Sequence, residues 1–214
     1  MMVSLLVAIE SALIAYALCS KGPFRLRGLI AVNMILISLL ASKLISIGGM
    51  VTNAGTVLYA AVVLGQVIIF DRFGKQAAVD TIKMTLYALI AALSLSYVVA
   101  NLPVIYGNEG ESYALLMMSD FSLRVVLASF FAFVIGQATL VLSMYKTRSY
   151  IATVVLAQAV DSLIFFPIAF GIFKFGEVWE IMIVGFWFKV FVSIPMYLLF
   201  TAFAYATGRW CDRM

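Results

Sequence analysis

The chain has 214 residues, of which 65% are hydrophobic and only 11% are charged, and its mean hydropathy is +1.13. Water-soluble domains are about a quarter charged and about half apolar, so this composition excludes a soluble globular protein, a disordered chain and a secreted disulfide scaffold. It is typical of a polytopic membrane protein with little mass outside the bilayer.

The sequence contains no histidine, and its two cysteines, Cys19 and Cys211, form no CxxC pair. Histidine is the commonest metal ligand and general base, so a zinc or haem site and Ser-His catalysis are not expected. We therefore predict no metal, no cofactor and no enzymatic activity. The remaining catalytic alternative is an intramembrane acid dyad, in which Asp161 would have to pair with Glu10.

Apolar stretches long enough to cross a bilayer determine the predicted fold, because a spanning helix needs about 20 mostly apolar residues. We predict a single integral membrane domain over residues 1–214 with spans at 2–19, 28–50, 54–70, 79–102, 121–145, 150–173 and 180–208. The third span is short and ends at Asp71. The predicted fold is an all-α bundle of about seven transmembrane helices: a six-helix core plus an N-terminal helix.

The first stretch differs from a signal peptide. It lacks a positively charged start, carries Glu10 in its middle and has no small-x-small cleavage site. We expect it to remain as a helix. Ala8 and Ala12 form a ridge of small residues on it, a feature common in packed membrane helices.

Charge predicts the orientation, because cytoplasmic loops carry the excess of Lys and Arg. With seven spans, one side of the membrane receives Lys21, Arg25, Arg27, Arg72, Lys75, Lys83, Lys146, Arg148, Arg209 and Arg213. The other side receives Lys174 with Glu109, Glu111, Asp120, Glu177 and Glu180. We therefore place the N-terminus outside and the C-terminus in the cytoplasm, in an inner or plasma membrane. The net charge of +4 indicates topology and contact with anionic lipid rather than nucleic-acid binding.

Ionisable residues inside the spans are the strongest functional signal: Glu10, Lys43, Arg124, Asp161 and Lys189. Each charge at the bilayer centre costs roughly 2.5–3.5 kcal/mol on insertion scales, so these side chains need partners or a wet cavity. In the predicted orientation the three cations lie in the outer half and the two acids near the middle. The pattern predicts a cationic outer vestibule above a central carboxylate.

Structural alternatives exist for these charges. Arg124 could pair with Asp120 one turn away at a solvated helix start. Lys43 and Lys189 could extend their ammonium groups to the outer headgroups. Asp161 is too short and too deep to do so, but it could simply tie two helices together.

A polar and aromatic face surrounds Asp161 on the sixth span. Gln158, Ser162 and Phe165 lie at helical spacing from it. A carboxylate can accept two N–H donors from the edge of a heterocycle, and a ring can stack on its face, so this group suits a flat, hydrogen-bonding ligand. Trp187 and Lys189, with Ser193 and Tyr197, add a second mixed surface on the seventh span, although aromatics at helical spacing are more often ordinary packing.

Several blocks of the sequence resemble the queuosine-precursor transporters, also called the vitamin uptake transporter family. The resemblance runs from about the second span to the C-terminus. Its recognisable pieces are Ser42-Lys43, Gly48-Gly49, Ala54-Gly55 with Tyr59, Phe73-Gly74-Lys75, the run 124–133 with Gly136-Gln137, the run 158–170, and Phe188-Lys189 with Ser193 and Pro195. The blocks on the fifth and sixth spans are the most specific.

This resemblance implies import of 7-deazaguanine bases such as preQ0, preQ1 or queuine. It places Arg124, Gln137, Asp161 and Lys189 on characteristic polar positions of the family, and Lys43 as well. The sequence departs from the pattern where acidic residues are expected, at Val67 beside Gln66 and at Leu140. Ser38 stands where an Asn is expected. The N-terminal helix is additional to the six helices of other members.

The sequence therefore predicts a transporter for a small planar heterocycle, without nucleic-acid partners. Asp161 would accept donors of the ring, Gln158 and Gln137 would complete the edge, and Phe165 or Trp187 would stack, while Lys43, Arg124 and Lys189 would hold neighbouring helices. Glu10 or Asp161 could relay protons; no P-loop for ATP hydrolysis is present. The alternative is a substrate-binding subunit for another vitamin or nucleobase that works with a separate energising module. A homodimer is also open, as are the substrate and the driving force.

Overall fold

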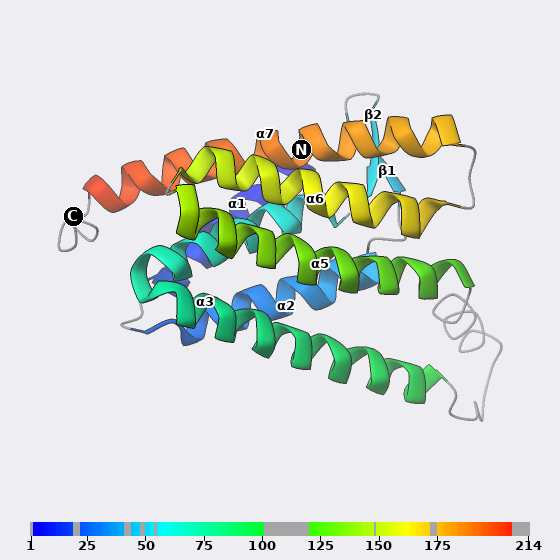
Figure 1. Cartoon of the computed structure of the whole chain (residues 1–214), viewed down its shortest axis with the longest axis horizontal. Coiled ribbons are helices and arrows are strands. Elements are labelled where there is room, and N and C mark those ends of the chain that lie inside the picture. Colours follow the sequence, from blue (N-terminus) through cyan, green and yellow to red (C-terminus); the bar gives the residue numbers. More distant parts are fainter. Residues whose placement is uncertain are drawn as a thin grey trace.

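The computed structural model describes residues 2–18, 22–40, 44–47, 50–53, 55–100, 120–147, 149–171 and 175–206. Their elements are α1 (Met2–Leu18), α2 (Phe24–Leu40), β1 (Leu44–Ile47), β2 (Met50–Asn53), α3 (Thr56–Ala100), α5 (Asp120–Thr147), α6 (Tyr150–Phe170) and α7 (Phe175–Ala206). The long helices lie roughly along one direction and form a bundle (Figure 1). The predicted fold class, a polytopic helical membrane bundle, is confirmed.

Four helices of the described chain are long and apolar enough to cross a membrane: those over Leu58–Val98, Arg124–Thr147, Tyr150–Phe170 and Val178–Leu198. The first of these contains two helical arms. Gly74 interrupts α3 with φ 84° and ψ 174°, a backbone region that is essentially restricted to glycine. The chain reverses there, and the two arms run back past each other (Figure 1).

The first arm of α3 is the central helix of the bundle. Its residues from Leu58 to Ile69 that the structure describes are buried on every face, which explains why the sequence reads there as a continuous apolar run. Gln66 turns its amide toward the second arm and donates to the carbonyl of Ala78 at 2.8 Å. This bond satisfies a buried polar group and holds the two arms together.

The predicted span 28–50 is wrong in its second half. Helix α2 ends at Leu40, and an antiparallel hairpin follows, with Leu44 paired to Asn53 and Ile47 paired to Met50. The sequence between the last pair is Gly48-Gly49, a dipeptide favoured in two-residue hairpin turns. The hairpin lies beside α7 at the end of the bundle where α2 ends and α3 begins (Figure 1).

Large apolar side chains cover the outer surfaces of the helices, the reverse of a soluble protein. Exposed examples are Leu36, Tyr87, Leu95, Phe131, Leu163, Phe191 and Leu198. On α6 the buried positions recur every three or four residues, so one stripe faces the bundle and the opposite stripe is left for lipid. The chain is therefore a multi-pass membrane protein.

Two of the basic residues that are predicted to share one side of the membrane, Arg27 and Lys75, lie at the same end of the bundle. Arg27 at the start of α2 donates to the carbonyl of Ala77 and to the hydroxyl of Thr81, both just past the reversal in α3. Lys75 at that reversal lies 4.5 Å from the ring centre of Tyr145 near the end of α5. These contacts join the ends of α2, α3 and α5.

Candidate functional site

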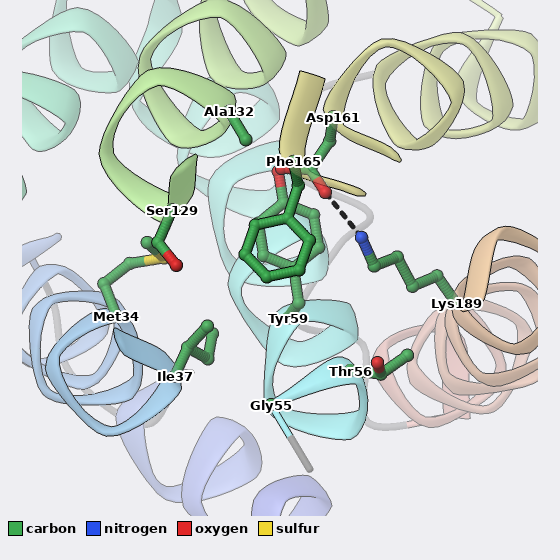
Figure 2. Close-up of a pocket in the computed structure, with 10 residues that line it drawn as sticks. All are labelled: Met34, Ile37, Gly55, Thr56, Tyr59, Ser129, Ala132, Asp161, Phe165 and Lys189. Atoms are coloured by element: carbon green, nitrogen blue, oxygen red, sulfur yellow. Dashed lines mark hydrogen bonds and ion pairs between the residues drawn. The ribbon is translucent and has the colours of Figure 1, made fainter. Parts of the chain in front are cut away.

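A cavity lies between the first arm of α3 and helices α2, α5, α6 and α7. Its lining residues are Met34, Ile37, Gly55, Thr56, Tyr59, Ser129, Ala132, Asp161, Phe165 and Lys189. Figure 2 shows the α2 and α5 side chains on one side, Asp161 and Lys189 on the other, and the rings of Phe165 and Tyr59 in the middle. Five helical segments from distant parts of the sequence therefore meet at one site.

An ion pair forms the charged side of this cavity. The ammonium of Lys189 on α7 lies 2.5 Å from Oδ2 of Asp161 on α6, and the two side chains are only 4% and 5% exposed. The same ammonium donates more weakly to the Ser162 hydroxyl at 3.4 Å and lies 4.9 Å from the centre of the Tyr59 ring. Each charge thus compensates the other, as a low-dielectric site requires.

The cavity is small in this conformation. The space open to the centre of a water-sized sphere is ≈ 20 Å³. A water molecule needs about 10–15 Å³ by this measure, so the cavity has room for water but not for a bicyclic base. A larger ligand requires the surrounding helices to separate.

Gly136 lets α5 approach the site closely. A Cβ at this position would lie 3.1 Å from the Tyr59 hydroxyl and 3.3 Å from Cβ of Asp161. The absent side chain therefore allows α3, α5 and α6 to meet directly beside the cavity. The next residue, Gln137, is 1% exposed at the same level of the bundle.

Several uncharged polar groups around the cavity are buried without a hydrogen-bond partner among the described residues. They are the hydroxyls of Tyr59 and Ser129, both amide atoms of Gln137, and Oε1 of Gln158. A buried polar group without a partner costs roughly 1–3 kcal/mol, so a cluster of them indicates groups that bind something else. They offer both donors and acceptors.

Gln158 and Phe165 share the buried face of α6 with Asp161, as the helical spacing predicts. The Gln158 amide donates to the Ser193 hydroxyl on α7 at 3.2 Å. Phe165 lines the cavity and makes an edge-to-face contact with Phe166, with ring centres 5.2 Å apart. Phe165 thus forms part of the cavity wall, whereas the amide nitrogen of Gln158 joins α6 to α7.

Two predicted site residues, Arg124 and Trp187, lie elsewhere, and Arg124 does not join Lys189 in the expected cationic vestibule. Arg124 belongs to the exposed stripe of α5 that includes Leu127 and Phe131. Trp187 is 53% exposed on α7, because residues two positions apart on a helix point in different directions and Lys189 points inward. Neither side chain lines the cavity.

Two further predictions concern Lys43 and Glu10. Lys43 lies outside the described residues. Glu10 is buried on α1, where its Oε2 accepts a hydrogen bond of 2.9 Å from the amide of Asn33 on α2. It does not line the cavity, and its described contact joins the N-terminal helix to the bundle.

The positions that depart from the resemblance are all buried. Val67 and Leu140 are 0% exposed and belong to the apolar core around the first arm of α3. Ser38 donates its hydroxyl to the carbonyl of Met34 on its own helix. These three positions therefore contribute to the packed interior of the bundle.

Tyr59 and Ser129 were not among the site residues predicted from the sequence. Both line the cavity and both carry unpartnered hydroxyls. Tyr59 is one turn past Gly55 in an otherwise apolar run, and Ser129 stands between the small residues Ala128 and Ala132. A polar group isolated on a buried helix face is the signal that could have identified each of them.

Comparison with known proteins identifies the family. Residues 53–206, from the end of β2 to the end of α7, match the family described as "Putative vitamin uptake transporter". No protein of curated function and no solved structure matches the chain. The matched region contains every helix that carries Tyr59, Ser129, Asp161 and Lys189. The chain belongs to the vitamin uptake transporter family.

Proposed function

We propose that this protein imports a small planar heterocycle, of the 7-deazaguanine type used as queuosine precursor, through the cavity beside Asp161. The observation that carries the proposal is a buried carboxylate lining a cavity in the middle of a membrane bundle, ringed by unpartnered donors and acceptors. Carboxylates and amides recognise the N–H edges of bases, and aromatic rings stack on their faces.

Each group has a proposed role in binding. Oδ2 of Asp161 is held by Lys189, and the Tyr59 hydroxyl lies beside the same carboxylate, so a ligand N–H group binds Asp161 in competition with Tyr59. Ser129 supplies a further hydrogen bond from the opposite side, Tyr59 and Gln137 supply others next to Asp161, and Phe165 stacks on the ring. Lys189 orients the carboxylate, and Gln158 keeps α6 and α7 in register through Ser193.

Transport in this proposal proceeds by alternating access. The cavity is too small for a base in the closed conformation, so α2 and α5 must move relative to α6 and α7 to admit one. The site then opens first to the outside and later to the cytoplasm. The basic end of the bundle, with Arg27 and Lys75, faces the cytoplasm in this arrangement, following the distribution of positive charge.

The driving force is a separate part of the proposal. Glu10 and Asp161 are the buried carboxylates that could relay protons. If Glu10 does so, Glu10→Gln abolishes the dependence of uptake on a proton gradient and leaves binding intact. If accumulation by the unmodified protein survives collapse of that gradient, the protein is a passive carrier with metabolic trapping.

The test of the proposed function is uptake of labelled preQ0 in a host that depends on salvage and lacks any energising module for vitamin uptake. We expect uptake with the unmodified chain and its loss with Asp161→Asn. Asp80→Asn is the matched control, because Asp80 lies on the second arm of α3 outside the cavity. Equal uptake by Asp161→Asn and the unmodified protein, at equal expression, would contradict the proposal.

The second candidate is a binding subunit that docks on a separate energising module. Ala8 and Ala12, the ridge of small residues on α1, are exposed in the described chain. In this case the chain alone binds the base but does not accumulate it. The same uptake experiment distinguishes the two, because the host lacks such a module.

A further inference from the structure

The charges in the cavity add up to zero before any ligand arrives. Among its lining residues Asp161 is the acid and Lys189 the base, and they contact each other at 2.5 Å. The other buried carboxylate of the described helices, Glu10, is bonded to Asn33 between α1 and α2, away from the cavity. Within the described site, Asp161 is the carboxylate that could compensate a ligand cation, and it is already paired with Lys189.

Lys189 also occupies the positions that a ligand cation would prefer. Its ammonium lies 4.9, 5.5 and 5.9 Å from the ring centres of Tyr59, Phe166 and Phe165. Cations bind favourably over such rings. A second positive charge would have to displace the lysine from these rings and from Asp161, or share them against like-charge repulsion.

The polar groups that remain unpartnered are all uncharged. Those around the cavity are the hydroxyls of Tyr59 and Ser129, both amide atoms of Gln137 and Oε1 of Gln158. These groups can bind a neutral heterocycle through donors and acceptors, but they cannot offset the cost of moving a net charge out of water.

From these observations we infer that the site selects uncharged planar heterocycles over cationic ones, and that Lys189 is the residue that determines this specificity. The inference rests on the proposed function and narrows its substrate class. Lys189 acts as an internal counter-ion that fills the place of a ligand amine. The Asp161–Lys189 pair therefore persists when the base is bound.

The test compares two bases that share one ring system and differ in charge. The nitrile preQ0 is neutral, whereas preQ1 carries a protonated aminomethyl group at neutral pH. Binding of each is measured by calorimetry on the full chain in lipid nanodiscs. We expect preQ0 to bind roughly 10-fold or more tightly than preQ1, because the site provides no free counter-ion for the amine.

Lys189→Gln exposes the carboxylate and gives the site a net charge of −1, so the preference for preQ0 should shrink at least tenfold or reverse. The double variant Asp161→Asn with Lys189→Gln removes both charges, and it should again prefer preQ0, at lower affinity. If Lys189→Gln alone does not fold, binding to the double variant can still be measured, because that variant leaves no unpaired charge.

The possible results distinguish the proposed function from the inference about ligand charge. Binding of both bases with preQ1 equal to or tighter than preQ0 in the unmodified protein overturns the inference and leaves the proposed function standing. A preference for preQ0 that Lys189→Gln leaves unchanged overturns the role of Lys189. Binding of neither base overturns the proposed function and the inference together.

Discussion

Asp161 and Lys189 form a buried pair whose members depend on each other. Replacing one partner leaves the other charge uncompensated, which typically costs 3–5 kcal/mol, whereas replacing both with apolar residues is often neutral. The pair joins α6 to α7 at the cavity, so its loss affects both stability and binding.

We therefore expect Lys189→Met to lower the free energy of unfolding by about 3–5 kcal/mol, because the buried Asp161 loses the partner that compensates it. Thermal unfolding in detergent measures the effect as a lower melting temperature. The combined change Lys189→Met with Asp161→Leu should recover most of the loss. Lys83→Met is the matched control, since Lys83 is exposed on α3. A melting temperature equal to that of the control would show that the pair is not a coupled unit.

A second residue-scale prediction concerns the contact between α1 and α2. Asn33→Ala removes the donor to Glu10 and leaves a buried carboxyl oxygen without its partner. We expect a destabilisation of about 1–3 kcal/mol. The readout is again the melting temperature, compared with Glu10→Gln, which retains a side-chain acceptor for Asn33. Equal stability of Asn33→Ala and the unmodified protein would mean that this bond does not hold α1 in place.

For individual residues, the sequence predicts which helix face a side chain belongs to better than it predicts which side chain it contacts. The spacing of Gln158, Asp161 and Phe165 places them on one buried face, and the structure confirms it. The partner of Asp161 was not predictable, because it depends on which face of α7 packs against α6. For the same reason Arg124 and Trp187 were assigned to the site although they point outward: position within an apolar span says nothing about direction.

Among the elements, the reversal in α3 depends most clearly on one residue. Gly74 has φ 84° and ψ 174°, and a Cβ there would have nothing within 4 Å, so the constraint is backbone conformation rather than space. The Gln66–Ala78 hydrogen bond then holds the two arms in position.

We expect Gly74→Ala to destabilise the protein by about 1–3 kcal/mol, the cost of a strained backbone region for a residue with a Cβ. Gly28→Ala is the control: Gly28 lies inside α2 with open space around it, so alanine there should be neutral or slightly stabilising. The two variants are compared by thermal unfolding. If both change the melting temperature equally, the conformation at Gly74 is not what limits substitution.

The hairpin shows that the length of an apolar run does not by itself identify a membrane-spanning helix. Apolar residues run from Leu29 through Val51 with few interruptions, and this length predicts a helix. Gly48-Gly49 between two short apolar segments is the competing signal for a hairpin turn. The separation of the predicted spans 54–70 and 79–102, by contrast, was visible from the charges around Gly74, and the structure places the reversal there.

For the molecule as a whole, the distribution of charge and apolar surface determines how it sits in the membrane. Exposed apolar side chains cover the helices, and basic residues collect at the end that contains the reversal in α3. The positive-inside rule then predicts that this end faces the cytoplasm.

Reporter fusions test this orientation. We expect a C-terminal green fluorescent protein to fluoresce and a C-terminal alkaline phosphatase to be inactive, because the first folds in the cytoplasm and the second only outside it. If α1 crosses the membrane, a tag at the N-terminus should be accessible from outside the cell. Active phosphatase at the C-terminus would reverse the orientation, and a cytoplasmic C-terminus with an N-terminal tag that is inaccessible from outside would remove α1 from the count of spans.

The most direct test of the account is an experimental structure of the full chain in lipid with preQ0 bound. We predict a widened cavity with the base between Asp161 and Ser129, its ring against Phe165, and Lys189 still in contact with Asp161. A base bound at another place in the bundle, with this cavity still closed, would contradict the account.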